Sequence, residues 1–163
     1  MERDNTSVTY GSDMLEEREV SFPPAHTAEH LLNQTMIRLF GCERSFNAHV
    51  ERKKSKMSFR LDHKPSRQEE KEIERRMNEL IDEDLPVTFE FVDRDSLPDG
   101  ISLDRLPAEA GDMVRLVRIG DYDVCPCIGK HVRSTGQIGR FEMLGTNWDE
   151  MEHSFRVRFK IKQ

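Results

Sequence analysis

Apolar residues recur at helical spacing in two segments of the chain. The first pattern predicts a helix over residues 25–40 that ends before Gly41. Its apolar positions are Leu31, Met36, Ile37, Leu39 and Phe40. The second helix is expected to start after Ser66, which forms a capping-box pattern with Glu69, and to end near Asp84. Its expected buried stripe is Ile73, Met77, Leu80 and Ile81.

Period-two alternation predicts strands through most of the remaining chain. Residues 44–62 are typical of a hairpin whose turn is the basic run 52–56. The other expected strands are 87–92, 113–119, 141–144 and a closing strand. In that closing strand Phe155, Val157, Phe159 and Ile161 point inward, and Arg156, Arg158, Lys160 and Lys162 point to solvent. Strands dominate around two helices, so we expect an α+β fold with a largely antiparallel sheet, two main helices and one domain.

The expected domain covers residues 25–163, preceded by an irregular lead-in over 1–24. Within that lead-in, residues 20–22 are expected to form an edge strand. Much later in the chain, residues 93–111 are expected to form a long connection with a short helical turn. No basic start followed by an apolar run is present, and no apolar stretch is long enough to span a bilayer. We therefore expect a cytoplasmic protein without a membrane partner, with its three cysteines reduced. The sequence does not define an oligomeric state.

Charge adds one restriction on partners. The 163 residues carry a net charge of −6, which argues against broad, nonspecific affinity for nucleic acid. It does not exclude a local basic surface.

Two pairs of metal-ligand residue types occur four residues apart. His26 and His30 project from one face of the first predicted helix, as two ligands of one tetrahedral ion would. Cys127 and His131 lie in a loop, where thiolate and imidazole suit zinc. Each pair alone is more typical of structural residues than of a metal site, and Cys125 is an alternative thiol. Together they predict one zinc site. An open coordination position would make this site catalytic, whereas four firm protein ligands would make it structural.

The same residues resemble a known family. The segment 26–32 resembles the His-x-x-x-His motif of alanyl-tRNA synthetase editing domains and free-standing AlaX proteins, and 127–131 resembles their Cys-x-x-x-His motif. The run 132–139 is similar to the threonine-glycine-acidic/amide-isoleucine-glycine segment of that family, and the second helix after Pro65 is similar to the helix that follows its first hairpin. The similarity covers about residues 25–144, in the family's order. Ile128-Gly129-Lys130 departs from the Gly-Gly-Thr common in the synthetases.

The resemblance implies zinc-dependent hydrolysis of the ester of misacylated tRNA(Ala), with serine or glycine removed, and a sheet and two helices around a metal-containing cleft. Carried over by position, the zinc ligands are His26, His30, Cys127 and His131. Residues expected to take part in catalysis are Thr27, Glu29 and Gln137, and those expected to bind substrate are Ser45, Asn47, Thr135 and Gly136. Either a metal or oriented backbone N–H groups near residues 136–139 could stabilise the developing oxyanion.

Binding of the tRNA acceptor end requires cations near the site. The candidates are Lys53, Lys54, Lys130 and Arg133, with Arg52, Lys56 and Arg140 as further members. Lys130 is somewhat more typical of a solvated side chain than of a phosphate contact, and the basic row of the closing strand is expected to be an ordinary solvated face. Two other functions remain open. One is hydrolysis of a small ester or amide without tRNA, which the negative net charge of the chain favours. The other is a noncatalytic zinc-binding module.

Overall fold

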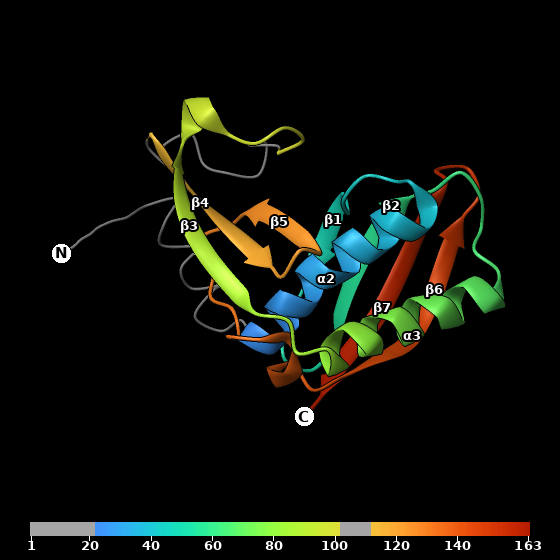
Figure 1. The fold of residues 1–163 in the computed structure, drawn as a ribbon. Helices are drawn as coiled ribbons and strands as arrows, with labels where there is room; N and C mark the ends of the chain where they lie inside the picture. The colour runs from blue at the N-terminus through green and yellow to red at the C-terminus, as the bar shows by residue number, and fades with distance from the viewer. Residues whose placement is uncertain (1–21, 102–111) are drawn as a thin grey trace.

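The structure is a computed structural model that describes residues 22–101 and 112–163 (Figure 1). In chain order its elements are helix α2 (Pro23–Phe40), strands β1 (Asn47–His49) and β2 (Ser55–Arg60), helix α3 (Arg67–Asp82), strand β3 (Val87–Asp93), the 3-10 turn η1 (Arg94–Ser96), strands β4 (Met113–Ile119) and β5 (Asp123–Pro126), the 3-10 turn η3 (Thr135–Gln137), and strands β6 (Arg140–Asp149) and β7 (Ser154–Lys162). The expected α+β class is confirmed.

The strands form two antiparallel sheets. One has the order β1-β2-β7-β6 and the other β3-β4-β5. Alternation along a strand indicates which face is buried but not which strand lies beside it, so the sequence did not predict the division into two sheets. Figure 1 shows α2 and α3 lying over one face of the four-stranded sheet, with the three-stranded sheet beside α2.

The main core lies between these two helices and the four-stranded sheet. The inward residues of β7 are all buried, as predicted, and Phe155, Val157 and Phe159 are no more than 1% exposed. The predicted stripe of α3 is buried as well, and it joins the same apolar cluster as Leu31 and Met36 of α2. Burial of these side chains supplies most of the driving force that fixes α2 in place.

The helix ends differ slightly from the expected ones. Helix α2 begins at Pro23, whose fixed φ suits the first helical position, and Phe22 before it is buried. Its end is confirmed, because Gly41 takes the left-handed conformation with φ 67°. The capping box of Ser66 and Glu69 is confirmed, although α3 ends at Asp82.

Several expectations lie partly or wholly outside the described residues. These are most of the lead-in, the first two positions of the predicted edge strand at 20–22, and the end of the 93–111 connection. The short helical turn in that connection is confirmed as η1. Among the helices of the described segments, none is long and apolar enough to cross a membrane.

Candidate metal centre

Four side chains from two distant segments meet at the N-terminal end of α2. The ligand atoms of His26, His30, Cys127 and His131 all lie within 4.8 Å of one another. The two α2 histidines share one helix face, while the other two side chains come from the loop after β5. Cys125 is not in this group, so the structure brings Cys127 and not its neighbour to the cluster.

Two of the three imidazoles use their outer nitrogen for a hydrogen bond within the protein, whereas Nδ1 of His30 lies 3.7 Å from Asp123 without one among the described residues. Nδ1 of His26 lies 2.9 Å from the carbonyl oxygen of Lys130, to which it donates. Nδ1 of His131 lies 2.9 Å from Oγ1 of Thr27. These contacts leave Nε2 of both rings for the cluster, and Nε2 of His131 is buried without a hydrogen-bond partner among the described atoms. An outer hydrogen bond that orients the ring is the usual arrangement of a metal-binding histidine.

The distances fit a shared metal ion. Sγ of Cys127 lies 3.5 Å from Nε2 of His26. Two ligands of one tetrahedral zinc, with bonds of about 2.3 Å to sulfur and about 2.0 Å to nitrogen, lie roughly 3.5 Å apart. The cluster can therefore bind a metal ion, and its sulfur and nitrogen donors favour zinc.

The electrostatics of the cluster favour a thiolate. Burial raises the pKa of Cys127, but the facing imidazoles of His131, His26 and His30 outweigh it and lower the pKa to about 2. Burial also lowers the pKa of His131 to about 4, which keeps this ring neutral at physiological pH. A deprotonated thiol and neutral imidazole are the forms that bind metal.

Asp123 lies next to His30 in the structure, and the spacing of residues in the sequence did not predict this contact. Its Oδ2 lies 3.7 Å from Nδ1 of His30, and its side chain is fully buried. Arg44 and Gln34 both donate to its Oδ1. Burial opposes its ionisation, yet His30 and Arg44 hold the pKa of Asp123 below its ordinary value. These contacts cross 79 or more positions of sequence for Arg44 and Gln34, so no local pattern indicates them.

The loop that carries Cys127 is fixed by two further residues that the sequence left unassigned. Gly129 packs directly against the imidazole of His26, where a Cβ atom would collide with the ring. Arg115 of β4 donates to the carbonyl oxygens of Cys127 at 2.7 Å and Gly129 at 2.5 Å. Its guanidinium also lies over the ring of Phe89, 4.5 Å from the centroid. The departure from Gly-Gly-Thr thus retains the one glycine that the approach of His26 requires.

The residues expected to take part in catalysis occupy different environments. Thr27 is completely buried, and its hydroxyl oxygen also accepts from the N–H of Val132 at 3.2 Å. Its position is that of a residue that orients His131. Glu29 places Oε1 4.0 Å from Nε2 of His26, so its carboxylate lies beside the cluster. The side-chain oxygen of Gln137 accepts from the N–H of Arg133, which ties it to the adjacent turn.

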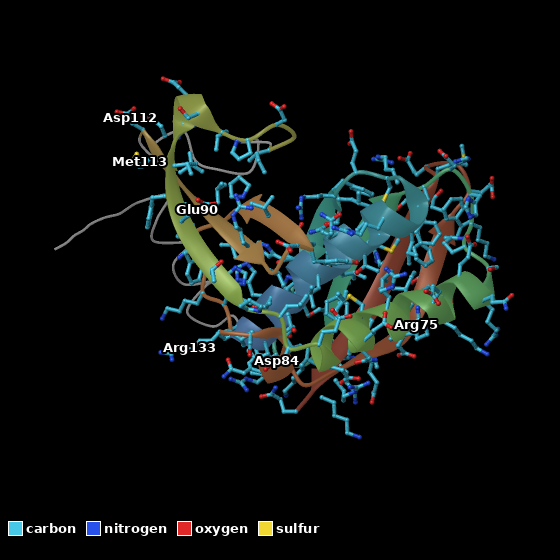
Figure 2. The ribbon with its side chains drawn as sticks, viewed as in Figure 1. Arg75, Asp84, Glu90, Asp112, Met113 and Arg133 are labelled. Atoms are coloured by element: carbon cyan, nitrogen blue, oxygen red, sulfur yellow. The ribbon has the colours of Figure 1, made fainter. Side chains whose placement is uncertain are left out.

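The 135–138 turn is a structural connection between α3, β3 and the loop. The hydroxyl of Thr135 donates to Leu80 and accepts from the N–H of Leu85, both at 2.8 Å. The N–H of Gly136 donates to Asp84, at the end of α3 in Figure 2, and those of Gln137 and Ile138 bond within the turn. These three N–H groups already have acceptors within the protein, so an oxyanion contact from them would require those bonds to break, and the contact stays a prediction.

Ser45 and Asn47, which are expected to bind substrate, are not among the residues of the cluster. Ser45 is fully buried, and its N–H donates to Asn33 in the middle of α2. Asn47 pairs with Ser58, which is opposite Arg156, so its side chain lies on the sheet face turned away from the helices. Substrate contacts by these side chains are not part of the function proposed below.

The predicted cations lie in two places. Lys53 and Lys54 are exposed in the turn between β1 and β2, at one end of the four-stranded sheet. Lys130 and Arg133 are exposed in the cluster loop, and Figure 2 labels Arg133 near Asp84. Only the second pair adjoins the candidate metal centre.

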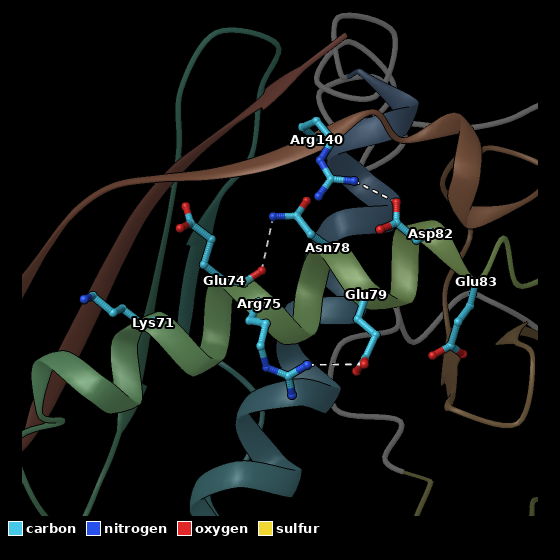
Figure 3. A pocket seen from close by; sticks show the side chains of 8 residues that line it. All are labelled: Lys71, Glu74, Arg75, Asn78, Glu79, Asp82, Glu83 and Arg140. Atoms are coloured by element: carbon cyan, nitrogen blue, oxygen red, sulfur yellow. Dashed lines mark hydrogen bonds and ion pairs between the residues drawn. The ribbon is translucent and has the colours of Figure 1, made fainter.

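A charged hollow along α3 lies apart from the cluster (Figure 3). Its lining is Lys71, Glu74, Arg75, Asn78, Glu79, Asp82, Glu83 and Arg140. Arg75 pairs with Glu79, and Arg140 pairs with Asp82. None of the cluster residues lines it, and its charges largely satisfy one another.

Comparisons with known proteins agree with this arrangement. The family described as "Threonyl and Alanyl tRNA synthetase second additional domain" matches residues 114–154, which include Cys127 and His131. The chain is 35% identical over 124 residues to "Alanine--tRNA ligase" of Halorubrum lacusprofundi, covering 74% of this chain and 13% of that protein. It is 31% identical over 137 residues to "Alanyl-tRNA editing protein AlaX-L" of Pyrococcus horikoshii, covering 82% of this chain and 32% of that protein.

The fold and the site thus define a domain of the synthetase-associated editing type. The chain belongs to the family of alanyl-tRNA synthetase editing domains and AlaX-type proteins. It spans about a third or less of the length of the curated relatives described above.

Proposed function

We propose that the protein hydrolyses the ester bond of misacylated tRNA(Ala) in trans, removing serine or glycine, with zinc held by His26, His30, Cys127 and His131. The observation that carries the proposal is the convergence of three imidazoles on one thiol, in a chain related to proteins named for alanyl-tRNA formation and editing. The substrate is made where translation takes place, so we expect the protein to act in the cytoplasm.

An aminoacyl ester is already reactive, so a protein accelerates its hydrolysis mainly by orienting the ester and a water molecule. A zinc ion at the site supplies a Lewis acid. Thr27 and Asp123 orient the rings of His131 and His30, and we assign Glu29 as the acceptor of the proton from water, because it lies beside the cluster. Phe89, 47% exposed and 6.3 Å from the ring of His131, offers an aromatic face for a nucleotide base.

Deacylation assays test the proposal. The protein is incubated with Ser-tRNA(Ala), Gly-tRNA(Ala) and Ala-tRNA(Ala), and zinc content is measured on the same sample. We expect preferential loss of serine or glycine, and at least a hundredfold slower reaction with less zinc in His26→Ala. His63→Ala is the matched control, because His63 is exposed and outside the cluster. Equal slow loss of all three esters, unaffected by His26→Ala, would contradict the proposal.

A noncatalytic zinc module is the second candidate, and the number of ligands favours it. Four nitrogen and sulfur side chains are typical of closed structural sites. Stoichiometric zinc combined with no deacylation of any of the three substrates would support this candidate.

A further inference from the structure

The sheet face turned away from α2 and α3 collects cationic side chains from three strands. Arg156, Arg158, Lys160 and Lys162 alternate along β7 with the buried core residues. Lys56 of β2 lies opposite Arg158, and Arg140 of β6 lies opposite Lys162. Directly opposite residues in an antiparallel pair share a face, so these six residues start from one surface, called here the basic sheet face. At the edge of this face the side chain of Arg140 turns back to Asp82 of α3.

Most of this positive charge is not neutralised by nearby acids. Glu142 pairs with Lys160 at 3.5 Å, and Asp82 pairs with Arg140 at 2.7 Å. Among residues 22–101 and 112–163, ion pairs of this face within 4.0 Å involve Lys160 and Arg140 but not Lys56, Arg156, Arg158 or Lys162. The whole chain has a net charge of −6, so this face departs strongly from the average charge of the protein.

The shape of the face suits an extended chain of negative charges. Successive outward residues of a strand are spaced by about 6.8 Å, which places cations in a regular row along β7. A register shift in β6 brings Gly145 opposite Arg158, whose guanidinium lies directly over this glycine, where a Cβ would collide with it. The exposed turn with Lys53 and Lys54 directly precedes Lys56, so it extends the basic surface at one end of the sheet.

We propose that the basic sheet face binds the phosphodiester backbone of an RNA duplex and holds the tRNA while its acylated end is hydrolysed. The inference rests on the proposed function for the identity of the RNA. A regular row of Arg and Lys, most of them without an ion pair, can contact phosphates on an open surface without reading base sequence. The sequence favoured a solvated face for the outward row of β7, because alternation within one strand does not show which cations of neighbouring strands lie beside it.

Binding to a fluorescent RNA hairpin with the length of a tRNA acceptor stem, measured by anisotropy at several salt concentrations, tests the proposal. The variant is Arg156→Gln/Arg158→Gln/Lys162→Gln. The matched control is Lys64→Gln/Arg67→Gln/Lys71→Gln, which changes the net charge equally but lies in and just before α3, over the other side of the sheet. We expect the face variant to bind at least tenfold more weakly at low salt, and the slope of log affinity against log salt to fall by about 2 to 3. The control should change affinity less than about twofold.

Equal weakening in both variants, or no weakening in either, overturns the proposal. Loss of binding to phosphatidylserine vesicles in the face variant, with RNA affinity unchanged, assigns the face to membranes and also overturns it. Thermal melts check that each variant is folded, and Arg156→Gln/Arg158→Gln repeats the test with fewer changes. Hydrolysis of seryl-adenosine, which lacks the duplex, should be unchanged in the face variant. If the wild-type protein binds RNA through this face but hydrolyses neither Ser-tRNA(Ala) nor seryl-adenosine, only the proposed function is contradicted.

Discussion

Gly129 is the residue at which the loop backbone comes closest to the candidate metal centre. Its Cα faces the His26 imidazole so closely that any side chain would overlap the ring. The ring cannot retreat without losing its bond to the Lys130 carbonyl, which lies in the same loop. At the scale of single residues, the site is therefore determined as much by this glycine as by its ligands.

We predict that Gly129→Ala displaces His26 and weakens zinc binding at least tenfold, because a displaced ligand loses its geometry. Competition with a chromophoric chelator measures the affinity. Ile128→Ala is the control, because Ile128 is exposed in the same loop. Unchanged affinity in Gly129→Ala would show that the loop can move without cost.

Thr27 and Thr35 provide a matched pair of buried hydroxyls on α2. Thr27 accepts from His131, whereas Thr35 bonds to the hydroxyl of Tyr122 at 2.7 Å. We expect Thr27→Val and Thr35→Val each to lower the free energy of unfolding by about 1–3 kcal/mol, because each leaves a buried polar group without its partner. Only Thr27→Val should also weaken zinc binding, by roughly 10- to 100-fold. Calorimetry and zinc titration on both variants separate the two effects, and equal zinc affinities would remove Thr27 from the site.

At the scale of elements, the end of α3 and the η3 turn are joined by Asp84. Hydrogen bonds from Ser134 and from the N–H of Gly136 hold the pKa of its carboxyl below the ordinary value of 3.8. The ionised form is thus favoured by the folded state. Its contribution to stability is present above pH 3.8 and is lost as pH falls through the lower folded-state pKa.

We therefore expect Asp84→Asn to be less stable than the wild type near pH 6, and this difference to disappear as the pH falls below 3.8. Urea unfolding of metal-free protein across this range measures it, so that protonation of the cluster ligands does not contribute. Asp62→Asn, at an exposed position, is the control. A difference that persists at low pH would mean that the charge of Asp84 is not the cause.

At the scale of the whole molecule, the cluster joins α2 to a loop about 100 positions later in the chain. A metal ion that binds only the folded protein stabilises it by mass action, and zinc at 100 times its Kd contributes about 2.7 kcal/mol. We expect chelation to lower Tm by about 5–10 °C. Cys127→Ser should be nearly insensitive to added zinc and to chelator, and an equal shift in this variant would place the bound zinc elsewhere.

The local elements were largely predictable from the sequence. The Ser66 capping box, the left-handed end at Gly41 and the alternation of β7 each depend on neighbours within a few residues. The pairing of His26 with His30 is equally local, because helical spacing alone places both on one face. The meeting of this pair with the Cys127 pair required the family resemblance, since spacing does not relate distant segments.

The sequence by itself thus determined the α+β class, the positions of both helices and of most strands, and the residue types of the candidate metal centre. It did not predict β5 (Asp123–Pro126) or the full length of β6 (Arg140–Asp149). Only the tertiary structure decided which thiol joins the cluster, that Asp123 supports His30, and that Gly129 is sterically required. It also decided that one row of β7 cations is part of a surface that includes Lys56 and Arg140. The physical reason is common to all four: helix and strand periodicity repeats within a few residues, whereas these contacts depend on strand pairing and packing between residues far apart in the chain.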